Sequence, residues 1–291
     1  MTRIWANGPL LLALAMLFWA GSVITGRAGA ALIPPSLFTL LRWSGALLIV
    51  APLAWPHLRR DAPALLRRWW VVVLLAVLGV DAYNNLVYRG LHTTTAVNAL
   101  LLQSATPLFV LVADIALFRA WPTSRQIVAI LISIGGVLTI AAQGSLAVLW
   151  HLTFNPGDVL VTTAVTLYAL YTSLLRVRPA VNPLSLLASA IALGDVFLIP
   201  LAWTEYQSGA RLHPTPLAIA SLAYAGIFPA FLAYLFYNRG VELVGTARAG
   251  QYVHLMPVFG VLLATVFLGE ALHPYHGLGI ALIAAGLWLA R

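Results

Sequence analysis

Ten apolar runs, each of about 16–26 residues, divide this sequence and constrain its fold more than any other feature. A helix that crosses a bilayer needs about 20 mostly apolar residues, and the runs fall close to that length. They are continuous rather than alternating at every second residue, which argues against a transmembrane β-barrel. We predict an all-α polytopic membrane protein, with spans at residues 10–26, 36–55, 69–88, 93–118, 126–142, 159–175, 184–203, 215–238, 246–268 and 275–290.

The composition supports a membrane protein and excludes several functions. Hydrophobic residues make up 62% of the chain and charged residues 8%, whereas soluble domains average about 45–50% and about 25%. The chain has no cysteine, which excludes disulfides and thiolate metal sites. Its net charge of +8 comes from arginines in short clusters between apolar runs, the pattern of membrane loops. We therefore expect contact with lipid, no nucleic-acid partner, no metal and no cofactor.

The arginines also predict the orientation, because cytoplasmic loops of membrane proteins are enriched in basic residues. With the N-terminus in the cytoplasm, outer segments hold only Arg27, Arg89 and Arg211. Cytoplasmic segments then hold twelve arginines, which are Arg3, Arg59, Arg60, Arg67, Arg68, Arg119, Arg125, Arg176, Arg178, Arg239, Arg248 and Arg291. We predict that both termini are cytoplasmic.

The two halves of the sequence resemble each other at an offset of about 150 residues. The matched positions are Arg89-Gly90 with Arg239-Gly240, Pro107 with Pro257, Phe109 with Phe259, Ile130 with Ile280, and Gly136 with Gly286. Each half holds five spans, and because five is odd the second half enters the membrane from the opposite side. This predicts two inverted five-helix repeats, at 1–142 and 158–291, joined by a periplasmic connection at 143–157. Transporters built in this way bind substrate near mid-membrane, where the halves meet.

Short motifs in both halves resemble the EamA-type exporters of the drug/metabolite transporter superfamily. The motifs are Trp19-Ala20-Gly21 and Tyr168-Ala169 early in each repeat, and Met256-Pro257 followed by Gly269-Glu270 in the second. The first half departs from the pattern, with Phe118-Arg119-Ala120 at the position of the acidic ending. The resemblance implies ten helices in two five-helix repeats, a bacterial inner-membrane location, and export of amino acids or other small metabolites.

Apart from Arg248 at the start of the ninth span, four charged side chains lie inside the predicted spans, where charge is costly and is a functional candidate; they are Arg42, Asp81, Asp114 and Asp195. Arg42 and Asp114 lie near span ends, so we expect both to be anchored at the membrane interface. Asp114 would then reach toward Arg119 or Arg125. Asp195 lies near the middle of its span, so it needs a hydrogen-bond partner or a proton, in a structural or a functional role.

The third span carries a polar stripe on one helical face. Asp81, Asn84, Asn85 and Tyr88 stand at i, i+3, i+4 and i+7. In lipid these groups would be unsatisfied, so the stripe must face protein or water. It either lines a cavity or forms hydrogen bonds between helices. Asp81 is one candidate for proton coupling.

The ninth span carries Arg248, Gln251 and His254 at steps of three residues. At the repeat offset of 150 residues, Gln251 and His254 are equivalent to Leu101 and Ser104. Arg248 is equivalent to Asn98. His254 is either a buried structural histidine or a second candidate for proton coupling. Together with aromatic residues in the middle of other spans, these positions predict a substrate site lined by Trp19, Asn84, Tyr88, Asn98, Tyr168, Tyr234, Gln251 and His254. Matched helix-weakening residues predict hinges at Gly79, Pro107, Pro229 and Pro257.

These features favour a secondary transporter that exports a small metabolite, in particular a neutral or aromatic amino acid, by alternating access between the repeats. The alternatives are a sugar-phosphate or nucleotide-sugar carrier and a channel. A phosphate-binding Gly-x-x-x-x-Gly-Lys loop is absent, so we expect transport without ATP. No motif of a hydrolase or metalloprotease supports an enzyme. The expected partners are a small-molecule substrate and membrane lipid, and the architecture does not require an oligomer.

Overall fold

The structure is a computed structural model, and it describes residues 4–29, 32–94, 99, 102–142, 155–268 and 272–290. The regular elements within those ranges are all helical, as the apolar runs predict. The helices of the first half are α1 (Gly8–Gly29), α2 (Pro35–Arg67), α3 (Trp69–Leu75), η1 (Ala76–Ala82), α4 (Tyr83–Gly90), α6 (Thr106–Phe118) and α7 (Ser124–Ala141). Those of the second half are α9 (Pro156–Leu174), η2 (Leu175–Val177), α10 (Pro183–Gln207), α11 (Pro216–Ala225), η3 (Gly226–Leu232), α12 (Ala233–Val244), α13 (Thr246–Gln251), η4 (Tyr252–His254), α14 (Leu255–Leu268) and α15 (Pro274–Leu289).

Six helices in the described part of the chain are long and apolar enough to cross a membrane; they are Pro35–Arg67, Trp69–Gly90, Ser124–Ala141, Pro156–Val177, Pro183–Gln207 and Pro216–Val244. Three shorter apolar helices are Gly8–Ser22, Thr106–Phe118 and Pro274–Leu289. The count of ten spans therefore stays a prediction, although helical residues lie within each of the ten expected ranges. The helix α2 is longer than its predicted span, because it continues past Pro56 and Pro63 to Arg67.

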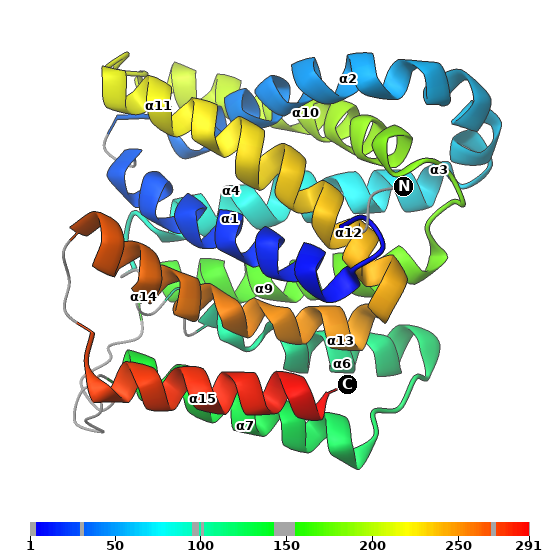
Figure 1. The fold of residues 1–291 in the computed structure, drawn as a ribbon. Helices are drawn as coiled ribbons and strands as arrows, with labels where there is room; N and C mark the ends of the chain where they lie inside the picture. Colours follow the sequence, from blue (N-terminus) through cyan, green and yellow to red (C-terminus); the bar gives the residue numbers. More distant parts are fainter. Residues whose placement is uncertain are drawn as a thin grey trace.

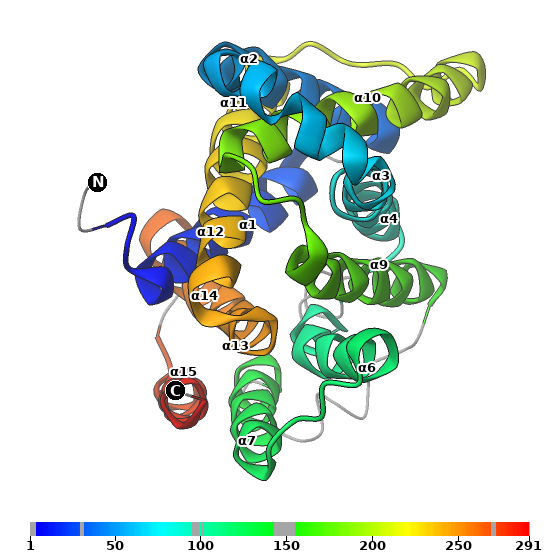
Figure 2. The same ribbon diagram turned by 90° about the vertical axis from the view of Figure 1, so that its right-hand side faces the viewer.

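The helices run side by side along one direction and stack from α2, α10 and α11 at one edge to α7 and α15 at the other (Figure 1). The helices α1 and α7 begin, and α15 ends, at the right of this view, which we call the termini side; the left is the opposite side. The helices α7 and α15 hold equivalent places in the two halves and run in opposite directions, as an inverted repeat requires. The view turned by 90° shows α15 end-on and many of the other helices obliquely, with α4, α9 and α6 on one flank and α12, α1 and α14 on the other (Figure 2).

Equivalent helices of the two halves are widened at equivalent positions. The segments η1 and η3 are seven-residue π-helices whose residue numbers differ by 150 throughout. They contain Gly79 and Pro229, two of the four predicted hinge residues. Proline lacks the N–H that an α-helix needs, and π-turns in α-helices are frequent at functional sites. The two residues that were expected to weaken their helices therefore lie in π-helical segments. Their role as hinges stays a prediction.

Residues related by the repeat offset touch each other along the centre of the molecule. The Asn84 amide nitrogen lies 3.2 Å from the Tyr234 hydroxyl, and the His254 ring nitrogen Nε2 lies 2.7 Å from the Ser104 carbonyl oxygen. Both pairs are 150 residues apart. In a two-fold arrangement, a residue contacts its own equivalent only near the axis, so these pairs mark the axis between the halves.

The packing of α7 against α15 continues this axis to one edge of the molecule. A Cβ atom added to Gly136 would lie 2.6 Å from the Gly279 carbonyl oxygen, and one added to Gly286 would lie 2.6 Å from the Ala129 carbonyl oxygen. Side chains do not fit at these two positions, because the two backbones approach closely there. Small residues serve the same purpose wherever membrane helices pack tightly.

Candidate functional site

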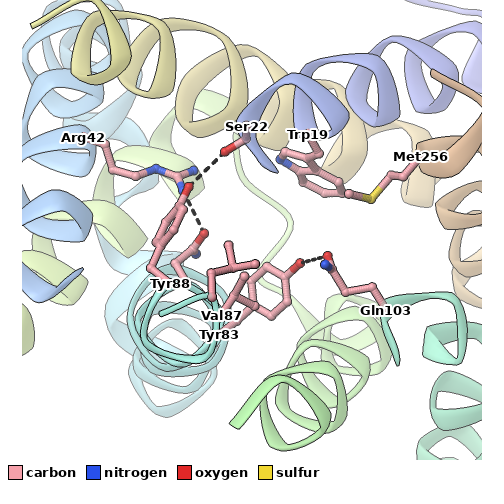
Figure 3. A pocket seen from close by; sticks show the side chains of 10 residues that line it. Trp19, Ser22, Arg42, Tyr83, Val87, Tyr88, Gln103 and Met256 are labelled. Atoms are coloured by element: carbon pink, nitrogen blue, oxygen red, sulfur yellow. Dashed lines mark hydrogen bonds between the residues drawn. The ribbon is translucent and has the colours of Figure 1, made fainter. Parts of the chain in front are cut away.

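A small cavity lies in the first half, next to the second, and is walled by polar and aromatic side chains (Figure 3). Its volume is about 30 Å³, which leaves room for water but not for a metabolite. The lining residues come from α1, α2, α4 and α14, from the residue after α4 and from the segment before α6; they are Trp19, Ser22, Arg42, Tyr83, Asn84, Val87, Tyr88, Leu91, Gln103 and Met256.

Arg42 lies in the wall of this cavity, and the prediction that it is anchored at the membrane interface is wrong. It is 2% exposed, and its Nη1 donates to Asn84 Oδ1 at 3.0 Å and to the Tyr88 hydroxyl at 2.6 Å. The Tyr88 hydroxyl is also 2.9 Å from Ser22 Oγ. The guanidinium carbon lies 5.1 Å from the centre of the Trp43 ring. Asn84, Tyr88 and Trp43 therefore contact the guanidinium directly, and Ser22 holds the Tyr88 hydroxyl.

Asn84 connects this group to the π-helix η1 and to the second half of the chain. Its amide nitrogen donates to the carbonyl oxygens of Gly79 at 2.9 Å and of Val80 at 3.0 Å. The Tyr234 hydroxyl donates to the same Gly79 oxygen. A π-turn frees carbonyl groups from the regular helical pattern, and here side chains of both halves use them. The stripe on the third span thus forms hydrogen bonds between helices at Asn84 while it also lines the cavity.

Trp19 forms the aromatic side of the cavity and is packed into a cluster of tyrosines. Its ring centre lies 5.7 Å from that of Tyr168, 5.4 Å from that of Tyr234 and 5.1 Å from that of Tyr237. Its indole nitrogen donates to the carbonyl oxygen of Pro229, in η3, at 3.1 Å. Trp19 therefore lies against the π-helix of the other half, and its equivalent region in the second half, around Tyr171, packs against Gly79.

The structure brings some of the predicted site residues to the cavity and not others. Trp19, Asn84 and Tyr88 line it, while Tyr168 and Tyr234 pack behind Trp19. Gln251 and His254 are fully buried and do not line it. Asn98 lies outside the described residues. Sequence reasoning did not select Ser22, Arg42, Tyr83, Gln103 or Met256, although Ser22 stands three residues from Trp19 and Arg42 was noted as an intramembrane charge.

Three other buried polar groups lie away from the cavity wall. The side-chain amide of Gln251 makes no hydrogen bond to a described residue, and neither does one carboxylate oxygen of Asp81. Asp195 accepts a hydrogen bond from Ser44 Oγ at 3.1 Å. That contact gives Asp195 the partner that its position requires, and it joins α10 to α2.

Asp114 is also placed differently from the expectation. It is 1% exposed and forms an ion pair with Arg176 at 2.6 Å, so the prediction of an interface anchor that reaches Arg119 or Arg125 is wrong. Ser173 Oγ and Thr246 Oγ1 donate to its carboxylate at 2.5 Å and 2.9 Å. We call these four residues, Asp114, Ser173, Arg176 and Thr246, the Asp114 cluster; it joins α6 to the second half on the termini side.

A second polar cluster joins helix ends on the opposite side. The Glu205 carboxylate accepts the backbone N–H of Ser36 at 2.9 Å and of Leu37 at 3.2 Å, at the start of α2. It also pairs with Arg89 at 3.2 Å, and Asn85 donates to Ser36 Oγ at 3.0 Å. We call Ser36, Asn85, Arg89 and Glu205 the Glu205 cluster; it joins α2, α4 and α10.

Known proteins match the chain along nearly its whole length. The model of the EamA-like transporter family matches twice, at residues 6–142 and 155–291. A protein of Archaeoglobus fulgidus named "Uncharacterized transporter" is 31% identical over 285 residues, which cover 96% of each chain. The "Uncharacterized transporter YetK" of Bacillus subtilis is 27% identical over 96% of this chain and 84% of its own.

One solved structure, described only as "Crystal structure of protein", has the same fold, with a TM-score of 0.79 and 18% sequence identity. The superposition covers 98% of this chain and 96% of the other. The two matches to the family model fall on the two halves that the internal repeat defined, and the relatives span the full length. The chain therefore belongs to the EamA-like transporter family and is a membrane transporter of the drug/metabolite transporter superfamily.

Proposed function

We propose that this transporter exports small metabolites, above all neutral or aromatic amino acids, by alternating access between its two halves. The observation that supports this most is the cavity beside the axis between the halves, where Trp19, Tyr83 and Tyr88 provide apolar walls beside polar groups. Sites for small molecules combine a largely apolar wall with a few fixed polar groups. A neutral amino acid presents both kinds of surface and fits such a lining.

The alternative substrates, sugar phosphates and nucleotide sugars, carry two or more negative charges. Arg42 is the one charged residue among the ten that line the cavity. A site for these anions would be expected to offer several cationic groups. The lining therefore favours a substrate with at most one anionic group, and the alternative remains an outcome of the transport experiment.

The test is transport by purified protein in liposomes without nucleotide. We expect radiolabelled neutral amino acids to exchange across the membrane and glucose 6-phosphate not to do so. The variant Trp19→Ala should lower the rate roughly tenfold, because it removes several aromatic contacts from the cavity wall. Trp121→Ala is the matched control, since Trp121 is an exposed tryptophan near the termini side. Exchange of the sugar phosphate alone would favour the alternative, and normal rates in Trp19→Ala would place the site elsewhere.

We also propose that the protein resides in a bacterial inner membrane with the termini side in the cytoplasm. The distribution of arginines supports this orientation, because Arg67, Arg119 and Arg125 stand at helix ends on that side. Reporter fusions after residue 291 and within residues 143–154 test it. We expect a cytoplasmic signal from the first fusion and a periplasmic signal from the second; the reverse signals would overturn the orientation.

A further inference from the structure

Arg42 is a buried cation to which the described residues offer no carboxylate. Its two hydrogen-bond acceptors, Asn84 Oδ1 and the Tyr88 hydroxyl, are both neutral. Its Nε makes no hydrogen bond to a described residue. Burial of a charge is costly unless an opposite charge balances it, and in a membrane span such a residue marks a functional site by default. The charge of Arg42 therefore requires an explanation.

Several other arginines of this protein form ion pairs with carboxylates of the same chain. Arg176 pairs with Asp114, Arg89 pairs with Glu205, and Glu242 pairs with two arginines on the termini side. Asp81 and Asp195 are two further buried carboxylates inside the predicted spans, and neither forms an ion pair with Arg42. Within the described residues the protein thus leaves the charge of Arg42 for something else to balance.

We propose that Arg42 binds the carboxylate of the transported substrate, an inference that rests on the proposed function and names the chemical group by which it selects substrates. Guanidinium groups bind carboxylates strongly, through charge-assisted and often paired hydrogen bonds. Arg42 lies in the cavity wall beside the hydroxyl groups of Ser22 and Tyr88, and whichever of them accepts in their mutual hydrogen bond can donate to the same anion. One cation matches one carboxylate rather than a doubly charged phosphate.

The other walls of the cavity fit the rest of such a substrate. Trp19 and Met256 lie across the cavity from Arg42 (Figure 3), and they provide an apolar surface for a side chain. The amide of Gln103 is held by Tyr83, whose hydroxyl donates to its Oε1 at 3.1 Å. Ligand pockets commonly measure about 300–1,000 Å³, far more than the present cavity, so binding requires the walls to move apart.

Competition with modified substrates tests the proposal on the wild-type protein. Phenylalanine, tryptophan, leucine and threonine are each compared with their carboxamides, which lack the negative charge and keep the remaining structure. We expect each carboxamide of a transported amino acid to inhibit on the order of 10- to 100-fold more weakly than its parent, because a charged hydrogen bond is lost. Equal inhibition by amide and parent would overturn the role of Arg42, whereas no transport of any of the four would contradict the proposed function itself.

Substitution of the arginine then assigns the effect to this residue. Arg42→Gln should raise the KM for the amino acid on the order of 10- to 100-fold and remove the preference over the carboxamide. Arg42→Lys keeps the charge and should restore part of that preference. Arg211→Gln, at an exposed arginine on the opposite side, is the control and should behave as wild type. A folded Arg42→Gln variant that still prefers the carboxylate would overturn the proposal while the proposed function stands.

Discussion

The two sides of the helix bundle are joined by polar clusters of different depth. On the termini side, Asp114 is 1% exposed and is satisfied by one arginine and two hydroxyl groups. On the opposite side, the Arg89 side chain is 42% exposed and that of Glu205 14%. A buried carboxylate that loses its partners has no water to replace them, whereas exposed groups do. The carboxylate at the centre of the termini-side cluster is therefore the more deeply buried of the two.

The internal repeat does not duplicate these clusters. Position 264, which lies 150 residues after Asp114, is an alanine, and the positions 148–150 residues before Glu205 are Trp55, Pro56 and His57. Equivalent helices and equivalent π-turns thus come from the repeated pattern. Each of the two polar clusters, in contrast, has no counterpart in the other half. The two halves are thus alike in the arrangement of their helices and π-turns. The two sides of the bundle differ in the charged residues that join the helix ends.

The largest effect is expected from Asp114→Ala. Removal of the carboxylate leaves Ser173, Thr246 and Arg176 without their common acceptor, so the free energy of unfolding should fall by about 3 kcal/mol. This value is at the low end for a buried pair, because the Arg176 side chain is 37% exposed and can reach water. Thermal unfolding of the purified protein in detergent measures the change. A loss below about 1 kcal/mol would show that the two sides do not differ as the burial indicates.

A smaller effect is expected from Glu205→Ala on the opposite side. Glu205 accepts the N–H groups of Ser36 and Leu37 at the start of α2, and loss of such a cap costs about 1 kcal/mol. The ion pair with Arg89 adds at most about 1 kcal/mol. The same unfolding measurement applies, with Asp114→Ala as the reference. Equal losses in the two variants would remove the distinction between the clusters.

The smallest effect is expected from Arg89→Gln. Exposed ion pairs contribute about 0–1 kcal/mol and are screened by salt. The difference in unfolding free energy between wild type and variant should therefore be below about 1 kcal/mol and should shrink further in 1 M NaCl. Arg211→Gln, which breaks no ion pair among the described residues, serves as the control. A difference that survives high salt would mean that Arg89 supports the helix ends in another way.

The apolar pattern of the sequence predicted the helices and the relation between the halves. The offset of 150 residues pointed to Gly79 and Pro229, and the structure places both in π-helices. This could be predicted because backbone breaks follow from residue type at a given position. The length of α2 could not, because prolines within a helix end it or merely bend it according to the packing around them.

The partners of charged groups were the part that the sequence could not supply. Asp114 stands one turn from the end of its helix, and its partner Arg176 lies 62 residues away in the other half. Arg42 stands seven residues after the start of α2, and its depth was judged from that spacing alone. Burial of Arg42 depends on Ser22, Asn84 and Tyr88 from two other helices, and a single sequence does not show that these helices meet there.

The close fit of α7 and α15 has a consequence for how the chain is made. The glycine face of α7 around Gly136 is shaped for a helix whose own glycine, Gly286, follows 150 residues later. At ordinary rates of synthesis of about 5–20 residues per second, that interval lasts about 8–30 s. During this time α7 is in the membrane without its final neighbour. The packing of α7 is thus completed only after α15 has been synthesised.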